Sequence, residues 1–437
     1  MEDFNSFIKP FDSSFWRVLR QSIVPFEDKP KDKEVFLADL YKSIKECTYS
    51  PGNPREYILS DKHNGAIRVV PTFNYKDSCT YYYCIKNIEE FIATQRVEGT
   101  FGGWQLGTPI RELEENEEPQ GVSAPTNSFN RKAWGENWKE FQKKAYEYSQ
   151  LDDYEYFIKV DIANFYDSIN LITLERKLRA LIPKNKCHIL DLLFTFLKGW
   201  NKRFEGYAEK TVGIPQDEIG DCSRILANFF LQDYDQRIYE LCRENDCKYL
   251  RFADDQLIMA KNKRSADIIL SHTSKELFKI NLYLNSAKIS RIKSKDDFNN
   301  YWCFELFDLL AEKNNKDNIN KAVKLFFEMS EKDKLFIKHS ALRRILNVNF
   351  KLIEAPLRYK LFAMIYEEYF LSNTDIWYMN KIAKNTDDKE ELYNNLDNLA
   401  QTCLHNAFHY NLLKFNKRWR PDKDNQYLLD KINELKI

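Results

Sequence analysis

The acidic pair Asp254 and Asp255 stands between two short apolar runs, and it constrains the local fold more than any other feature of the 437-residue chain. Residues 248–253 and 256–260 are rich in aromatic and branched side chains, so the segment predicts a β-hairpin with the acids at its turn. Two adjacent like charges repel and gain nothing from burial, so we expect a metal ion or another cation against them. For this fragment alone, an ordinary solvated Asp-Asp turn is an equal alternative.

A third carboxylate, Asp161, follows the strand-like run Tyr156–Val160. Divalent ions that act on phosphates take few protein carboxylates and keep positions open for substrate oxygens. An acid at a strand end, beside a hairpin that carries another acid, suits a pair of ions about 3.5–4 Å apart. Because adjacent strand residues point to opposite faces, we expect Asp254 to face Asp161 and the metals, and Asp255 to be more peripheral.

Four segments occur in the order that is typical of the palm of reverse transcriptases, and the chain resembles that family. They are "DIANFYDSI" for motif A, "GIPQDEIGDCSRILANFF" for motif B, "FADD" for motif C and "LYLNSAKIS" for motif D. The resemblance implies an α+β fold: a right-hand polymerase, with fingers and palm of reverse-transcriptase type, followed by an all-helical C-terminal domain.

The resemblance also implies an activity, that of an RNA-directed DNA polymerase that adds dNTPs to a primer on an RNA or DNA template. Asp161, Asp254 and Asp255 are then the catalytic and metal-binding residues. They would act with two Mg²⁺ ions, for which Mn²⁺ is a candidate substitute. One ion lowers the pKa of the primer 3′-hydroxyl, and the other neutralises the pyrophosphate as it leaves.

The nucleotide-binding candidates come from the same resemblance. A ring at Tyr166 would meet a ribose 2′-hydroxyl and so favour deoxynucleotides, although a core aromatic is the alternative because Phe165 is adjacent. The segment "ILSDKHNGAIRVVPTFNYKDS" resembles the basic fingers hairpin that grips the triphosphate, and "EGTFGGWQLG" resembles a glycine-aromatic fingers segment. Solvated charges or a simple turn are the alternatives there. The candidates are Lys62, Arg68, Tyr166, Gln216 and Lys288.

Motif B departs from the family at Asp217, which replaces the glycine that commonly follows Gln216. A carboxylate there would repel phosphate and prevent the close backbone approach that glycine allows, so we expect unusual templating or nucleotide handling. The run Ser223–Asn228 resembles the abortive-infection and other phage-defence reverse transcriptases of bacteria. The nucleic-acid-binding candidates are Ser223, Arg224, Lys417, Arg418 and Trp419.

The formal net charge is zero, but its distribution suits a nucleic-acid enzyme better than its sum. Residues 261–295 hold nine Lys and Arg against two acids, and residues 414–423 hold five bases against one acid beside two aromatic residues. Basic clusters can follow a phosphate backbone and aromatic rings can stack on bases, although charge runs usually mean a solvated surface. Nine cysteines, an acidic N-terminus and the lack of a long apolar stretch predict a cytoplasmic protein without a membrane partner.

Helical apolar spacing predicts helices over 13–24, 34–48, 171–182, 187–200 and 222–245, and Pro356 predicts a helix start. From about residue 301 glycine disappears and the pattern turns helical. We therefore expect N-terminal helices and fingers over 1–154, the palm over 155–300, and a helical thumb-like region with an extension over 301–437.

The leading hypothesis is a DNA polymerase that serves bacterial antiphage defence by abortive infection. A retron-like or group II intron-like reverse transcriptase and a catalytically inactive nucleic-acid-binding scaffold are the alternatives. The sequence does not identify the template, for which a dedicated non-coding RNA is one candidate, or whether synthesis is templated. It also does not identify the primer, for which a nucleic acid and a protein hydroxyl are the candidates. It also leaves open whether the chain forms a homo-oligomer or binds a partner protein, and what triggers the defence response.

Overall fold

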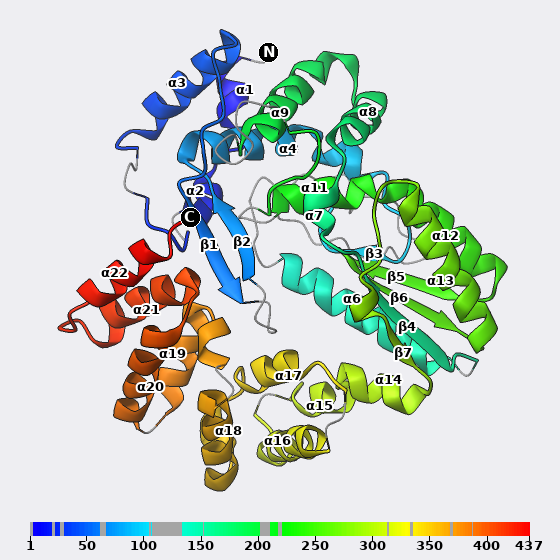
Figure 1. Ribbon diagram of the computed structural model, residues 1–437, viewed down its shortest axis with the longest axis vertical. Coiled ribbons are helices and arrows are strands. Elements are labelled where there is room, and N and C mark those ends of the chain that lie inside the picture. The colour runs from blue at the N-terminus through cyan, green and yellow to red at the C-terminus, as the bar shows by residue number, and fades with distance from the viewer. Residues whose placement is uncertain are drawn as a thin grey trace. The chain divides into compact units, whose positions relative to one another are not determined.

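The computed structural model describes residues 3–19, 22–26, 30–61, 67–104, 106, 133–151, 153–201, 210–216, 221–312, 314–332, 335–367, 370–386 and 388–437. The chain forms two compact units (Figure 1). The first contains Met1–Glu56 and Val70–Ser294, and the second contains Tyr57–Val69 and Lys295–Ile437. The chain therefore enters the second unit twice, once as a short excursion and once for its entire C-terminal part.

The first unit is built around a five-stranded sheet of order β3-β5-β6-β4-β7. The strands are β3 (Thr100–Phe101), β4 (Tyr156–Asp161), β5 (Lys248–Phe252), β6 (Asp255–Ala260) and β7 (Ser290–Ile292). β3 runs parallel to β5, and the other neighbours are antiparallel. The hairpin predicted around the acidic pair is thus confirmed as β5–β6.

Helices precede, cross and follow these strands (Figure 1). They are α1 (Phe4–Ile8), α2 (Ser13–Leu19), α3 (Lys33–Lys45), α4 (Tyr75–Ala93), α6 (Ala133–Gln150), α7 (Phe165–Ser168), α8 (Leu171–Leu181), α9 (Cys187–Gly199), α11 (Asp221–Phe230), α12 (Gln232–Glu244) and α13 (Lys263–Phe278). In the described part of this unit, the 3₁₀ turn η1 (Lys184–Lys186) precedes α9 and the 3₁₀ turn η2 (Ser286–Lys288) precedes β7.

Side chains alternate between the two faces of the sheet, as the period of a strand requires. Ile158 and Ile258 point into the main core of the unit, and α13 packs against their two strands, β4 and β6. Phe252 lies against α6, with its ring centroid 4.8 Å from that of Trp138. Helices therefore cover both faces of the sheet. A functional site is expected at an end of the sheet, where the strands stop.

Most predicted helices of the first unit are confirmed, with different ends. The predicted helix 222–245 is divided in two at Leu231. The predicted helix 34–48 is α3, which Asp32 caps by accepting hydrogen bonds from the amides of Glu34 and Val35. The predicted helix 13–24 is shorter, because α2 ends at Leu19.

The C-terminal part of the second unit is helical and encloses its own apolar core. Its elements are α14 (Lys295–Trp302), α15 (Phe304–Leu309), α16 (Lys316–Glu331), α17 (Lys338–Ile345), η3 (Phe350–Leu352), α18 (Ala355–Glu367), η4 (Phe370–Asn373), α19 (Ile376–Asn385), α20 (Lys389–Thr402), α21 (Asn406–Trp419) and α22 (Gln426–Glu434). α18 begins one residue before Pro356, which confirms that predicted start. The predicted α+β class with an all-helical C-terminal part is confirmed, and none of the described helices is long and apolar enough to span a membrane.

A two-stranded hairpin links the units along the chain: β1 (Glu56–Asp61) and β2 (Ile67–Thr72). Its base belongs to the first unit and its outer part to the second. Within the second unit, the buried amide of Asn406 lies beside the backbone of β1. Its Oδ1 accepts from the amide of Leu59 at 2.6 Å, and its Nδ2 donates to the carbonyl of Tyr57 at 2.8 Å. One side chain of α21 thus satisfies two backbone groups that a neighbouring strand would otherwise bind.

Candidate active site

Three carboxylates gather at one end of the five-stranded sheet. Asp161 is the last residue of β4 and Asp255 the first of β6, and the two are direct cross-strand partners. Asp254 lies in the turn before β6, next to Ala253, whose φ is +54°. Because Asp254 sits in a turn, the alternation of strand residues does not decide which way it faces.

The two hairpin acids, Asp254 and Asp255, have different electrostatic surroundings. Burial, followed by the charges of Asp255 and Asp161, raises the pKa of Asp254 to about 7. Asp255 instead has an ion pair, with its Oδ1 3.0 Å from Nζ of Lys159. Asp254 therefore carries the like-charge repulsion of the site, whereas the charge of Asp255 is partly balanced.

Two residues of motif D, Asn285 and Lys288, contact Asp161. The amide of Asn285 donates to the backbone carbonyl of Asp161 at 2.8 Å, and its Nδ2 donates to Oδ2 at 3.3 Å. Nζ of Lys288 lies 3.2 Å from the same Oδ2, although 61 % of this lysine side chain is exposed. The structure thus brings Lys288 to the carboxylates, as an exposed cation at the edge of the cluster.

The motif B turn is bonded to the segment that follows Asp161. The amide of Gly213 donates to the carbonyl of Ile169 at 2.7 Å, and the amide of Ile214 donates to the carbonyl of Tyr166 at 2.9 Å. Gly213 has a φ of +92°, and a Cβ there would lie 3.2 Å from the carbonyl oxygen of Asp167. Glycine is therefore required where motif B meets motif A.

The two aromatic residues after Asp161 differ in burial. Phe165 is buried in the core, and Tyr166 packs against the same core while remaining partly exposed. Gln216 is also partly exposed. Asp217, in which the chain departs from the family pattern, lies outside the described residues.

The fingers candidates lie on the β1–β2 hairpin. Lys62 is outside the described residues. Arg68 is exposed on β2, in the part of the hairpin that belongs to the second unit. Its predicted contact with a nucleotide stays a prediction.

Of the two predicted nucleic-acid contacts in motif B, one needs correction and the other stays a prediction. Ser223 is 1 % exposed, and its hydroxyl shares a hydrogen bond of 2.7 Å with the hydroxyl of Tyr81. The expectation that Ser223 binds nucleic acid is wrong in this structure, because α11 turns this side chain into the core. Arg224 is partly exposed and pairs with Asp221 at 2.8 Å.

The three C-terminal candidates differ in their exposure. Lys417 and Arg418 are exposed on α21, so they remain candidates for a phosphate backbone. Trp419 is partly buried: its ring stacks on Phe415, and its Nε1 donates to Oδ1 of Asn380 at 2.7 Å. The ring thus packs against the helical core but stays partly exposed, and its predicted contact with nucleic acid stays a prediction.

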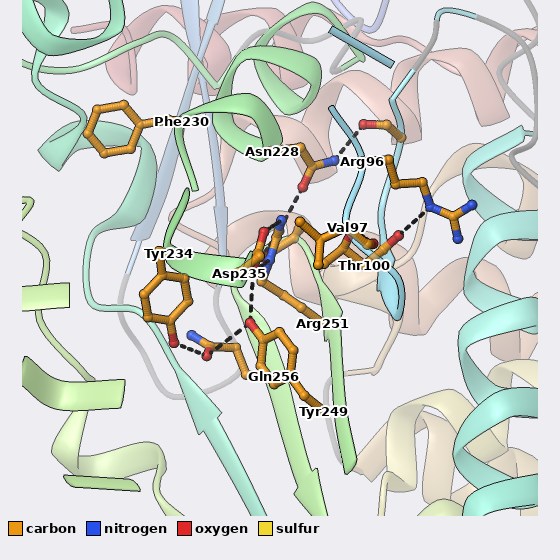
Figure 2. A network of polar contacts seen from close by, with 12 residues as sticks. Arg96, Val97, Thr100, Asn228, Phe230, Tyr234, Asp235, Tyr249, Arg251 and Gln256 are labelled. Carbon is orange, nitrogen blue, oxygen red and sulfur yellow. Dashed lines mark hydrogen bonds and ion pairs between the residues drawn. The ribbon is translucent and has the colours of Figure 1, made fainter. Parts of the chain in front are cut away.

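Sequence reasoning missed a buried polar network beside the Ala253–Asp254 turn, shown in Figure 2. Its central residue, Arg251, is fully buried and forms a two-point ion pair with Asp235 of α12. It also donates to Oδ1 of Asn228 in α11 and to the carbonyl of Ala253. The only signal was the arginine in the apolar run "KYLRFADD", since a strand arginine that faces the core must be paired.

Two glycines, Gly102 and Gly103, also lie close to the Ala253–Asp254 turn or to the residues that bind it. Gly102 has a φ of +102°, and a Cβ there would lie 2.8 Å from the amide nitrogen of Ala253. The carbonyl of Gly103 accepts a hydrogen bond from Nδ2 of Asn228. The stretch Thr100–Gly103 thus packs beside the motif C turn through β3 and its two glycines.

The donor set at the sheet end fits a divalent ion that is shared with a substrate. Among the described residues, no three His, Cys, Asp or Glu side chains are grouped to hold a metal ion by themselves. Mg²⁺ sites that act on phosphates use one or two carboxylates and complete their coordination with substrate oxygens and water. Asp161 and Asp254 supply hard oxygen ligands of this kind. A cation would offset both the burial of the Asp254 carboxylate and its repulsion by Asp255 and Asp161, which together raise the pKa of Asp254.

Comparison with known proteins agrees with the motifs. A family model described as reverse transcriptase (RNA-dependent DNA polymerase) matches residues 61–303. The Retron Ec83 reverse transcriptase of Escherichia coli is 32 % identical over 145 residues, which are 31 % of this chain and 42 % of that protein. The chain thus matches less than half the length of this relative.

Two solved telomerase structures also align over most of the chain. The apo telomerase from Candida tropicalis has a TM-score of 0.37 at 13 % identity, with 90 % of this chain and 74 % of that chain covered. The Candida albicans telomerase with a fragment of telomeric RNA has a TM-score of 0.39 at 10 % identity, with 93 % and 71 % covered. Scores this low carry no argument about fold or function. The family model, by contrast, spans more than half of the chain and includes all three carboxylates, so the protein belongs to the reverse transcriptase family.

Proposed function

We propose that the chain is an RNA-directed DNA polymerase that adds dNTPs by two-metal nucleotidyl transfer at Asp161 and Asp254. One observation carries the proposal: the fold places the ends of motifs A and C side by side, with Asp161 opposite Asp255 and Asp254 in the adjoining turn. The family membership supports the same reaction.

The carboxylates would hold two Mg²⁺ ions, with Mn²⁺ as a candidate substitute. When bound, such ions activate a primer 3′-hydroxyl and stabilise the charge of a leaving pyrophosphate. Asp161 and Asp254 are the proposed ligands. Asp255, with its charge shared by Lys159, is proposed to tune the negative potential of the cluster.

Side chains around the cluster are proposed to bind the nucleotide. Lys288 is exposed and within ion-pair distance of Asp161, so it can shift from that carboxylate to the phosphates of a dNTP. Tyr166 is proposed to contact the sugar, because its ring is partly exposed and its backbone is fixed to the motif B turn. Gln216 follows in that turn, and Arg68 and Lys62 belong to the proposed fingers hairpin.

The test of the proposal is the double substitution Asp254→Ala with Asp255→Ala. We expect dNTP incorporation by the purified protein to fall by at least about a thousandfold, because the transition-state charge loses its stabilisation. Thermal stability should change little, because the relief of like-charge repulsion at Asp254 offsets the lost ion pair between Asp255 and Lys159. Asp233→Ala, which removes an exposed acid of α12, is the matched control. Mg²⁺-dependent synthesis retained by the double mutant contradicts the assignment.

Tyr166→Ala tests the proposed sugar contact. We expect the ratio of NTP to dNTP incorporation to rise while the dependence on Mg²⁺ stays unchanged. If the ratio is the same as in the wild type, Tyr166 is a core aromatic and sugar selection lies elsewhere.

We also propose a role in bacterial antiphage defence, on the basis of the motif B resemblance. Phage plaque counts on bacteria expressing the wild type or the double mutant test this role. Equal plaque counts would remove it while leaving the polymerase assignment intact.

A retron-type enzyme is the second candidate, favoured by the identity to the Retron Ec83 reverse transcriptase. On this candidate the protein copies a dedicated non-coding RNA. Sequencing the nucleic acids that co-purify with the protein distinguishes the two, because a retron-type enzyme should retain one dominant RNA. The effect of Asp217 on templating stays a prediction, tested by Asp217→Gly on an arbitrary primer–template.

A further inference from the structure

We propose that Arg251 is a positioning residue for Asp254, and that Asp235 and Asn228 fix Arg251 in that role. We call these three residues the brace. The inference rests on the proposed function, since it assigns the brace the task of holding the metal-binding turn. Arg251 contacts the backbone of the turn, and Asp235 and Asn228 act through Arg251.

The donors of Arg251 are distributed over three partners from different elements. Nε and Nη2 donate to the two carboxylate oxygens of Asp235 at 2.8 and 2.6 Å. Nη1 donates to Oδ1 of Asn228 at 2.7 Å and to the carbonyl of Ala253 at 2.8 Å. The planar guanidinium lies between Asp235 of α12 and Asn228 of α11 (Figure 2). It thus links both helices to Ala253, the residue before Asp254.

Stability alone does not explain an ion pair in which both side chains are fully buried. Desolvation of two charges offsets most of their attraction, and well-packed apolar residues of similar volume are often equally stable. What such a replacement loses is the fixed direction of the hydrogen bonds. The bond that apolar residues cannot replace is the one to Ala253.

The turn that Arg251 contacts has a conformation that needs support. Ala253 has a positive φ, which is unfavourable for a residue with a Cβ and persists where the surroundings hold it. Its carbonyl is held by Arg251, and its amide faces the backbone carbonyl of Phe101 at 3.5 Å. Asn228 also donates to the carbonyl of Gly103, so it anchors the same glycine segment that packs on Ala253. The turn is therefore fixed from the motif B helix on one side and from β3 on the other.

Arg251→Lys is the first test, because it keeps the charge that balances Asp235 but loses the two-point geometry and the bond to Ala253. We expect the dissociation constant for Mn²⁺, measured by electron paramagnetic resonance without substrate, to rise about tenfold, as is typical when residues that orient metal ligands are changed. The kcat for dNTP incorporation should fall by a similar factor, and the KM for dNTP should change less.

Tyr249→Phe is the matched control in the same network. It removes the hydroxyl that donates to Asp235 at 2.9 Å but leaves every bond from Arg251 to Asn228 and Ala253. Its Mn²⁺ affinity and kcat should stay close to those of the wild type. If Tyr249→Phe is impaired as much as Arg251→Lys, the effect is a general loss of packing and the positioning role is overturned.

If Arg251→Lys does not fold, Asn228→Ala tests the positioning role of Arg251 instead. This variant keeps the ion pair and the bond to Ala253 but frees one side of Arg251 and releases Gly103, so we expect a smaller loss of Mn²⁺ affinity in the same direction. Wild-type Mn²⁺ affinity in a folded brace variant overturns the inference. A wild-type protein that binds Mn²⁺ but incorporates no dNTP contradicts the proposed function instead, which keeps the two failures distinct.

Discussion

Two hairpins carry the proposed chemistry of this protein, and they are held in different ways. The β5–β6 hairpin lies inside the five-stranded sheet, with β3 and β4 as outer neighbours, and a buried arginine contacts its turn. The β1–β2 hairpin forms a sheet of its own, and the amide of Asn406 binds the backbone of β1. The hairpin with the carboxylates is bonded to neighbouring strands and to Arg251, whereas in the hairpin with Arg68 the backbone of β1 is bonded to a side chain of the helical unit.

This difference suits what each hairpin is proposed to do. Carboxylates that share metal ions must keep their positions closely, because small displacements cost transition-state stabilisation. A hairpin that grips a triphosphate is proposed to move around each nucleotide, so the contact of Asn406 with β1 is expected to affect nucleotide binding more than metal binding. Substitutions in the two hairpins and their supports test whether the two kinds of support differ in this way.

Arg251→Ala should have the largest effect on stability. It leaves the carboxylate of Asp235 buried without its charge partner, and breaking a buried pair in this way typically costs about 3–5 kcal/mol. Urea denaturation measures the loss. The double variant with Asp235→Leu should recover much of it without recovering activity, and recovery of both would mean that the brace has no positioning role.

Gly102→Ala should destabilise the protein by more than about 1 kcal/mol, because alanine is strained at positive φ and its Cβ would lie 2.8 Å from the amide nitrogen of Ala253. Gly103→Ala is the matched control, since it has a similar φ but no atom within 4 Å of a Cβ. Only Gly102→Ala should also lower kcat. Equal kcat values for the two variants would show that the approach to the turn is not needed for activity.

Asn406→Ala should cost about 1–3 kcal/mol, because two backbone groups of β1 lose their partner in a buried site. The KM for dNTP should rise while kcat and Mn²⁺ affinity change little, because the carboxylate turn is not affected. Asn411→Ala, on the same helix, is the control: its Nδ2 donates to the carbonyl of Thr374 and not to β1. A KM that rises equally in both variants would assign the effect to the helical unit in general.

Arg68→Gln should have the smallest effect on stability, within about 0.5 kcal/mol, because the side chain is exposed. Its expected effect is a higher KM for dNTP at low ionic strength, with less difference from the wild type as salt screens the charge. Steady-state incorporation at two salt concentrations measures it. An unchanged KM would remove Arg68 from the nucleotide site.

Local patterns in the sequence determined the elements that carry the chemistry. Two apolar runs around Asp254 and Asp255 predicted β5–β6, and a strand ending at Asp161 predicted β4. These predictions succeed because a strand or helix leaves a periodic trace in neighbouring residues. The order of the four motifs along the chain was enough to indicate the family, because motif order is a property of the sequence alone.

Tertiary structure decided the residues whose role depends on distant partners. The burial of Ser223 could not be predicted from the sequence of α11. Nearly every residue from Cys222 to Phe230 is buried, so the helix has no exposed polar face that would distinguish inward from outward positions. Trp419 stands in a basic run and still packs on the helical core. Arg251 meets Asp235 and Asn228, and Asn406 meets β1, through hydrogen bonds between segments far apart in the chain. Such bonds depend on how elements pack, and packing leaves no periodic trace in the sequence of either partner.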